Sequence, residues 1–311
     1  MSAYAIARWG KRFLKLVLVL IVVFALTLGA FSLSQGGRAA LGRNFIRFAN
    51  AWSLHWPFAR GGYIVYRFAP VMRTVGAIPV RLDLEPGVTF LLDPIYDDLQ
   101  RTILLAHGDW QAGVWRSLSA DLREGAVFLD LGAHVGYFSL RASPKVGKTG
   151  RVIAFEPNPD TLKELRANIQ ASHASNIVVQ PIACTDAEQT LTLYSDRDHP
   201  AGASLSSANA GSKGGRFSYT VRGRRVDDVI RELRLTRVDV VKVDVEGAEL
   251  FVLKGALETL KRLHPKVVVE IMPANLANMN TKPEDIFRLM QEAGYTKSRQ
   301  VDDDDWEWTV R

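Results

Sequence analysis

The hydrophobic and polar positions of this 311-residue chain follow a regular alternation from residue 127 onward. Short apolar runs alternate there with amphipathic segments, which is the pattern of strands and helices in turn. We predict strands at 127–131, 151–156, 176–182, 238–244 and 266–271, and helices near 136–143, 159–172, 247–261 and 283–293. Strands separated by helices usually pair in parallel, so the sequence predicts an α/β fold with a doubly wound, mostly parallel sheet.

Two segments depart from this alternation. Residues 79–126 read as an N-terminal cap of the sheet domain, with a strand pair at 80–84 and 88–92 and a helix around 112–122. Residues 189–221 read as an insert, with short strands at 190–194 and 217–221 around a loop rich in glycine, serine and alanine at 201–215. The domain that begins at residue 127 is expected to continue to residue 311.

The N-terminal region carries a long apolar run. Leu16–Phe31 holds no charged residue, and the run extends to residues 13–33 if the Lys15 side chain reaches the membrane surface. This length is close to the ~20 residues that a membrane-spanning helix needs, so we predict a single transmembrane helix after a short basic N-terminus at 1–12. A cleaved signal peptide is the alternative, because basic residues precede the run. Basic residues flank the run on both sides, so charge does not fix its orientation.

Charge divides the chain into two parts. Residues 1–82 hold eleven Lys and Arg and no acid, whereas the remainder holds 28 basic and 33 acidic residues, a net charge of −5. The basic character therefore belongs to the N-terminal region, which argues against a nucleic-acid-binding core and for contact with anionic lipid. Residues 34–78 mix basic and aromatic residues, which suits either a membrane-proximal segment or a helix packed on the following domain.

The single cysteine and the acidic run near the C-terminus argue against a disulfide and against a metal site in that run. Cys184 is the chain's one cysteine, so no intramolecular disulfide can form, and we interpret it as a buried apolar residue. The acidic run at 302–305 is interpreted as a solvated hairpin loop before a terminal edge strand, because metal ligands seldom come from consecutive residues. No metal site is predicted, although Asp244 and Glu270 leave a dependence on a divalent ion open.

The stretch VFLDLGAHVGYFS, residues 127–139, predicts a strand, a glycine-bearing turn and a helix. Asp130 ends the strand with a carboxylate that can accept hydrogen bonds from ribose hydroxyls or from an ammonium group. Gly132 and Gly136 lack a Cβ, so the chain can turn sharply and a ligand can approach the backbone. A strand-to-helix turn without any ligand is the alternative interpretation.

Two more acids follow neighbouring strands. Glu156 ends the second strand, twenty residues after Gly136, where a carboxylate typically binds the ribose hydroxyls of an adenosine-containing ligand. Asp186 follows the third strand and is a candidate for the adenine amine or, equally, a turn residue. The G-x-x-x-G spacing differs from the G-x-G-x-x-G of dinucleotide-binding oxidoreductases and resembles the S-adenosylmethionine loop of Rossmann-like methyltransferases.

Charged residues gather at the end of the strand in VDVVKVDVEGAE, residues 238–249. Lys242, Asp244 and Glu246 lie where an unpaired buried charge is expensive, so they are expected to be paired or to face a substrate. An ion-pair network together with acids at a helix N-terminus is the alternative interpretation, and Glu249 fits it best.

Together VFLDLGAHVGYFS, AFEP, SLS at 204–206, RRVDDVI at 224–230, VKVDVEGAELFVLKGA and VVVEI resemble the FkbM family of S-adenosylmethionine-dependent methyltransferases over residues 83–300. The resemblance implies a seven-stranded methyltransferase sheet that acts mainly on hydroxyl groups of sugars or natural products. It places the cofactor at Asp130, Gly132, Ala133, His134, Gly136, Glu156, Pro157 and Asp186, and the acceptor at Lys242, Asp244, Glu246 and Glu270. His134 stands where asparagine is common, and Gln111 where glutamate is frequent.

The expected reaction is O-methylation of a sugar, glycolipid or lipid-linked hydroxyl at a membrane. Asp244 is the expected base or orienter of the acceptor, with Lys242 as its counter-ion, and His134 is an alternative base. A protein or lipid amine as acceptor, and a noncatalytic cofactor-binding protein tethered to the membrane, are the rival interpretations. We expect the catalytic domain to face the cytoplasm, where the cofactor is made.

Overall fold

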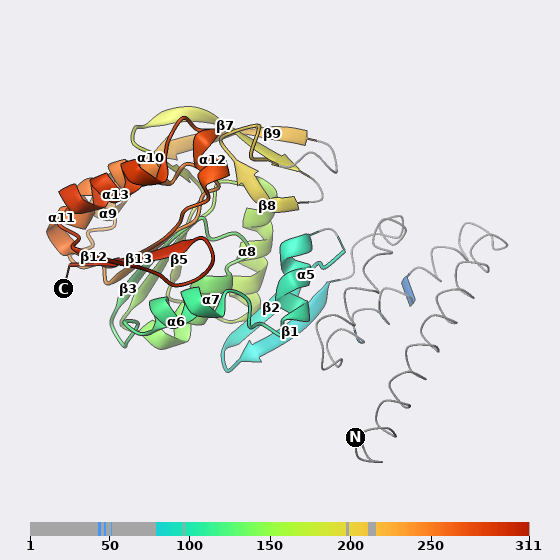
Figure 1. Ribbon diagram of the computed structural model, residues 1–311. Coiled ribbons are helices and arrows are strands. Elements are labelled where there is room, and N and C mark those ends of the chain that lie inside the picture. Colours follow the sequence, from blue (N-terminus) through green and yellow to red (C-terminus); the bar gives the residue numbers. More distant parts are fainter. Residues whose placement is uncertain are drawn as a thin grey trace, which may run out of the picture. The chain divides into compact units, whose positions relative to one another are not determined.

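A seven-stranded sheet is the centre of the computed structural model, which describes residues 79–310 without 96, 197–198 and 211–215, and also positions 43, 44, 47 and 51. The strand order is β12-β13-β11-β10-β3-β4-β5 (Figure 1). The strands are β3 Val127–Leu131, β4 Arg151–Phe155, β5 Ile177–Gln180, β10 Val240–Val243, β11 Lys266–Glu270, β12 Lys297–Gln300 and β13 Asp305–Thr309. Neighbours from β11 to β5 pair in parallel, and β13 is antiparallel to β11 and β12.

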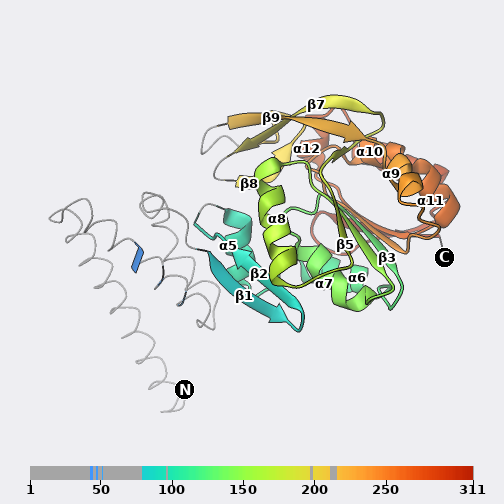
Figure 2. The same ribbon diagram turned by 180° about the vertical axis from the view of Figure 1, so that it is seen from behind.

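Helices cover both faces of this sheet, which confirms the doubly wound α/β prediction (Figures 1 and 2). One face carries α6 Ala112–Ser119, α7 Tyr137–Val146 and α8 Pro159–Ala171, and the other carries α9 Val226–Glu232, α10 Glu249–Gly255, α11 Leu257–Leu263 and α13 Pro283–Glu292. The short helix α12, Pro273–Ala277, follows β11. Every residue of β3 and β10 is buried, as expected for central parallel strands covered on both faces.

The segment before the sheet forms a hairpin and a helix. Strands β1 Val80–Glu85 and β2 Val88–Leu92 pair antiparallel as predicted, and α5, Asp98–Leu105, is a helix that the sequence reasoning did not find. Two backbone N–H groups of β2 donate to α8 and its C-cap residue: Thr89 N to Ser172 Oγ (2.9 Å) and Leu91 N to Asn168 Oδ1 (2.7 Å). These bonds use backbone donors of β2 that lie outside the hairpin's own ladder.

The insert forms a second sheet of order β6-β9-β7-β8. It contains β6 Ala183–Cys184, β7 Gln189–Asp196, β8 His199–Ser204 and β9 Arg216–Arg224. The two predicted strands are present as β7 and β9, which pair antiparallel along their length. Residues 201–204 were expected in a loop but belong to β8, and Cys184 is buried as predicted.

Two expected elements differ in the structure. The single helix predicted at 247–261 is two helices, α10 and α11, that meet at Ala256. The break is stabilised because the buried carboxylate of Asp227 accepts hydrogen bonds from the backbone N–H groups of Glu258 (3.1 Å) and Thr259 (2.9 Å), which caps α11. The terminal strand β13 is not an edge strand, since it lies between β11 and β12.

The predicted transmembrane helix at 13–33 lies outside the described residues, as does nearly all of the basic and aromatic segment at 34–78. The helices of the described ranges are all too short or too polar to cross a bilayer. The chain divides into two units, residues 1–78 and 79–311.

Candidate active site

A cavity of about 290 Å³ lies at the carboxyl ends of β3, β4, β10 and β11. Parallel α/β sheets place their ligands at this edge, and here the predicted residues of several strands meet. The sequence-predicted residues that line it are Gly132, Ala133, His134, Glu156, Pro157, Lys242, Asp244, Glu246 and Glu270. Asp130, Gly136 and Asp186 do not line it.

The two glycines of the turn after β3 adopt positive φ values and also allow neighbouring atoms to pack closely against them. Gly132 has φ +88° and Gly136 has φ +90°, a region that favours glycine. A Cβ on Gly132 would lie 1.8 Å from the carbonyl oxygen of Asp244, and a Cβ on Gly136 would lie 2.6 Å from Leu165 Cδ1. The close approach that Gly132 permits is therefore to the protein's own backbone at the end of β10, rather than to a ligand alone.

Glu156, the predicted ribose ligand, is buried at the end of β4 and faces the cavity. Its Oε2 accepts a hydrogen bond from the backbone N–H of His134 (2.8 Å), and its Oε1 accepts one from Asn158 N (2.8 Å). Each carboxylate oxygen can accept a second hydrogen bond, so both oxygens can still bind a ligand's hydroxyls. Burial raises the pKa of Glu156, while the nearby His134 opposes this effect.

Asp130 and Asp186, which were also predicted to bind the cofactor, do not line the cavity. Asp130 is fully buried, and its Oδ2 accepts a hydrogen bond from Ser139 Oγ (2.6 Å) while Oδ1 has no hydrogen-bond partner. Asp186 is exposed and accepts a hydrogen bond from its neighbour Thr185 (3.2 Å). The roles predicted for these two carboxylates in binding the cofactor stay predictions.

Lys242 and Asp244 form a largely buried ion pair at the end of β10. Lys242 Nζ lies 2.8 Å from Asp244 Oδ2, and the Lys242 side chain is 3% exposed against 20% for Asp244. Burial alone would lower the pKa of Lys242, but the carboxylates of Asp244 and Asp130 raise it above its ordinary value. The lysine therefore stays cationic, and its ammonium group also lies 4.8 Å from the centre of the Phe138 ring.

Three carboxylates gather on this side of the cavity. Oxygen atoms of Asp244, Glu246 and Glu270 lie within 4.8 Å of one another. Asn275 Nδ2 donates a hydrogen bond to Glu246 Oε2 (2.8 Å). Burial, followed by the charges of Asp244 and Glu246, raises the pKa of Glu270 well above its ordinary value. This wall is rich in hydrogen-bond acceptors, which suits a ligand that carries hydroxyl or amine donors.

Several wall residues were missed by sequence reasoning. Gln111 was noted only as a departure from the family pattern, yet it lines the cavity with φ +45° and a buried Oε1 that has no hydrogen-bond partner. Helix α5 contributes Asp98, Leu99 and Thr102, and the insert contributes Leu193, Ala201, Ala203 and Leu205. Two of these positions lie in or beside quoted motifs, Gln111 after GDW and Leu205 within SLS at 204–206, whereas the segments of α5, Leu193 and Ala201–Ala203 carry no recognisable motif.

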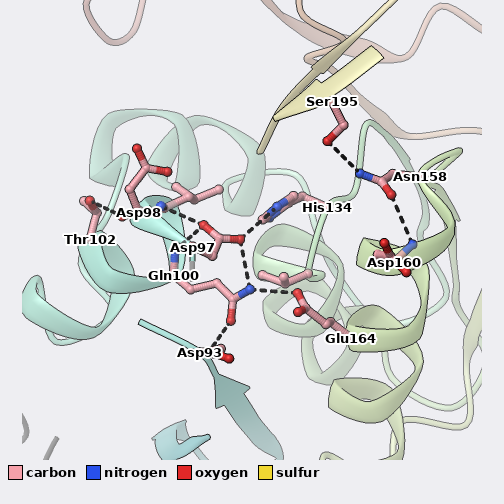
Figure 3. Close-up of polar contacts among 12 residues, drawn as sticks. Asp93, Asp97, Asp98, Gln100, Thr102, His134, Asn158, Asp160, Glu164 and Ser195 are labelled. Atoms are coloured by element: carbon pink, nitrogen blue, oxygen red, sulfur yellow. Dashed lines mark hydrogen bonds and ion pairs between the residues drawn. The ribbon is translucent and has the colours of Figure 1, made fainter. Parts of the chain in front are cut away.

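A polar network connects the cavity wall to α5 (Figure 3). His134 Nε2 lies 3.4 Å from Asp97 Oδ2, and Gln100 Nε2 donates to both Asp97 Oδ2 (2.9 Å) and Glu164 Oε2 (2.7 Å). His134 has φ +50°, in a region where histidine and asparagine are enriched among non-glycine residues. This conformation explains how a histidine can occupy a position where asparagine is common.

The donors and acceptors of the cavity fit a ligand with an adenosine and an amino-acid part. Glu156 has unused acceptor capacity for a ribose diol, and Gln111 Oε1 is a buried acceptor that an ammonium group can satisfy. Apolar side chains such as Leu193 and Phe155 provide surfaces for a base.

Comparison with known proteins gives the same family. The family model described as "Methyltransferase FkbM domain" matches residues 130–297. The hexuronic acid methyltransferase AglP of Haloferax volcanii is 29% identical over 180 residues, which cover 58% of this chain and 67% of AglP.

Two further matches cover less of the other protein. The AMB antimetabolite synthetase AmbE of Pseudomonas aeruginosa is 29% identical over 57% of this chain, but the match spans only 10% of AmbE. A solved methyltransferase FkbM from Methylobacillus flagellatus has a TM-score of 0.42 and 18% identity, over 67% of this chain and 53% of that one.

Proposed function

This chain belongs to the FkbM family of S-adenosylmethionine-dependent methyltransferases, and we propose that it methylates a hydroxyl group of a sugar, glycolipid or lipid-linked acceptor. The observation that carries the proposal is the Lys242–Asp244 pair, which lies in the same cavity as the ribose-binding candidate Glu156. The relative AglP, named for a hexuronic acid, supports a sugar as the acceptor class.

The residues divide into a donor side and an acceptor side. Ala133, His134, Glu156 and Pro157 would hold the cofactor, which supplies an electrophilic methyl group when bound. Asp244, 20% exposed in the cavity, is placed to accept the proton of an acceptor hydroxyl as its oxygen attacks in line. Lys242 stabilises the negative charge that develops on this oxygen and keeps the Asp244 carboxylate ionised.

The test incubates the full chain with S-adenosylmethionine and a panel of glycosides, glycolipids and amines. We expect a mass increase of one methyl group on a hydroxyl-bearing acceptor, at a position that resists mild acid hydrolysis as an ether does. Methylation of amines alone would overturn the choice of acceptor. Cofactor binding without turnover on any acceptor of the panel would favour the noncatalytic alternative.

We also propose that the chain is held at a membrane by residues 13–33, with the catalytic domain on the cytoplasmic side. The support is the apolar run of the sequence and its basic flanks. Extraction of membranes with alkaline carbonate should leave the full chain in the pellet, and residues 79–311 should be digested by protease added outside inverted vesicles. Release by carbonate, or protection of the domain in these vesicles, would contradict the anchor or the orientation.

A further inference from the structure

His134 connects the donor side of the cavity to helix α5 through two different groups. Its backbone N–H donates to Glu156 Oε2 (2.8 Å), and its imidazole Nε2 lies 3.4 Å from Asp97 Oδ2. The same residue therefore fixes the carboxylate that is expected to bind ribose and contacts a separate element of the cavity wall.

Asp97 determines where α5 begins. Its Oδ1 accepts hydrogen bonds from the backbone N–H groups of Leu99 (2.8 Å) and Gln100 (3.1 Å), which makes it the N-cap of the helix. Its side chain is only 3% exposed. Because Leu99 and Thr102 of this helix line the cavity, a change in the position of Asp97 changes the shape of the cavity.

Gln100 holds the same carboxylate oxygen of Asp97 that His134 contacts. Gln100 Nε2 donates to Asp97 Oδ2 (2.9 Å) and to Glu164 Oε2 (2.7 Å) on α8, and Asp93 N donates to Gln100 Oε1 (2.6 Å). Figure 3 shows Asp97 between Gln100 and His134. Asp97 Oδ2 thus has two partners, the neutral amide of Gln100 and the imidazole of His134, which can gain or lose charge.

The carboxylates whose charges act on the imidazole are Asp97 at the start of α5, Glu156 after β4 and Glu164 on α8. Burial alone would lower the pKa of His134, but Asp97, Glu156 and Glu164 together raise it above its ordinary value. Burial also raises the pKa of Glu164 to about 7. These carboxylates therefore stabilise the protonated form of His134, against the effect of burial.

We propose that His134 and Asp97 form a positioning pair that holds α5 and Glu156 in the arrangement that binds S-adenosylmethionine, and that loss of the His134 proton weakens this binding. The inference rests on the donor side assigned above, and it does not depend on which acceptor is methylated. His134 is a positioning residue because its imidazole acts through Asp97 rather than on the reacting atoms.

The test uses His134→Asn and Asp97→Asn in the full chain. Asparagine tolerates φ +50° at position 134, and at position 97 it can still cap α5, so each variant removes the charge but keeps the backbone geometry. His173→Asn is the matched control, because His173 also has a left-handed φ of +53° and is exposed. The readouts are the Kd of S-adenosylmethionine by calorimetry without acceptor, from pH 6 to 9, and the midpoint of urea unfolding.

We expect each variant to raise the Kd about tenfold at pH 7 and the double variant to raise it no further than one of them. The wild-type Kd should rise as pH increases through the titration of His134, whereas the Kd of His134→Asn should change little with pH. Unchanged affinity in folded variants, additive effects, or a wild-type pH profile in His134→Asn would overturn the proposal. Failure to methylate any hydroxyl would leave these binding results unaffected.

Discussion

The carbonyl oxygen of Asp244 occupies the space that a side chain at position 132 would need, because a Cβ on Gly132 would lie 1.8 Å from it. The turn that follows β3 and the end of β10 are therefore in direct backbone contact. This contact fixes the Asp244 carboxylate relative to the donor side of the cavity. Methyl transfer depends on the alignment of donor and acceptor, so in the proposed mechanism the backbone contact at Gly132 helps to set the catalytic geometry.

Gly132→Ala should destabilise the fold and reduce turnover. The substitution combines an unfavourable φ of +88° with displacement of the Asp244 backbone, and we expect a loss of at least about 3 kcal/mol in the free energy of unfolding. Gly87→Ala is the matched control, because φ is +81° there and no atom lies within 4 Å of the added Cβ. Urea unfolding of both variants checks this, and equal losses would show that the contact with Asp244 costs nothing.

Asp244→Asn should lower kcat by about 10²–10⁴-fold and leave the Kd of S-adenosylmethionine nearly unchanged. The amide keeps the shape of the side chain but cannot accept the hydroxyl proton. Initial rates and calorimetry on the same preparation separate the two effects. Retained turnover together with retained binding would remove Asp244 from the mechanism.

Chelators should leave the activity unchanged. Asp244, Glu246 and Glu270 lie close enough together to bind a metal ion, but the Lys242 ammonium already contacts Asp244 at 2.8 Å. Burial and the neighbouring acids also raise the pKa of Glu270, which favours its protonated form, and a protonated carboxyl is a poor ligand for hard cations. Initial rates measured with and without EDTA check this. Loss of activity that Mg²⁺ restores would show a metal-dependent enzyme.

Neutral sugar acceptors should be methylated at least about tenfold more efficiently than the matching uronic acids. The acceptor side presents the carboxylates of Asp244 and Glu246 against the single charge of Lys242, so a third carboxylate from the ligand would be repelled. Values of kcat/KM for a glucoside and the matching glucuronide provide the comparison. A preference for the uronic acid would show that the acceptor binds away from these residues.

Glu249→Gln should be more favourable for stability, relative to wild type, at pH 8 than at pH 5. Burial raises the pKa of Glu249 to about 7, although the backbone N–H of Gly247 donates to it and opposes the shift. The folded state therefore binds more protons than the unfolded chain, whose glutamate pKa is about 4.3, and wild-type stability falls as pH rises between these values.

Glutamine has no such titration and can still accept the backbone hydrogen bonds through its carbonyl. The difference between variant and wild type in the free energy of unfolding should grow by on the order of 3 kcal/mol from pH 5 to pH 8. Urea unfolding at the two pH values measures it. A difference that does not depend on pH would contradict a raised pKa at Glu249.

The central strands of the sheet and the part of the cavity at their carboxyl ends could be predicted because their signals are local. β3 is predicted to the residue, since Gly132 follows directly after its last residue, Leu131. Glu156 and Lys242 follow from their places at strand ends. Charged residues that follow an apolar run can be recognised in the sequence without knowledge of the tertiary structure.

The rest of the cavity wall depends on contacts between distant segments. Gln111 and α5 reach the cavity through loop geometry, and Asp227 breaks the predicted helix at 256 because it caps α11 from a neighbouring helix. The burial of Asp305 beside the Lys242 pair was also missed, because the acidic run at 302–305 looks solvent-exposed in the sequence. Such features require knowledge of which segments meet.

The sheet β6-β9-β7-β8 forms a part of the cavity wall that is separate from the central sheet. This sheet lies in the chain between β5 and β10. Its strands and the residue after β8 line the cavity with small or aliphatic side chains, at Leu193, Ala201, Ala203 and Leu205. By contrast, Glu156, Lys242 and Asp244 come from the central sheet or from the turns that follow its strands. Enlarging one alanine of this wall would therefore change the shape of the cavity without changing a residue of the ion pair or of the donor loop.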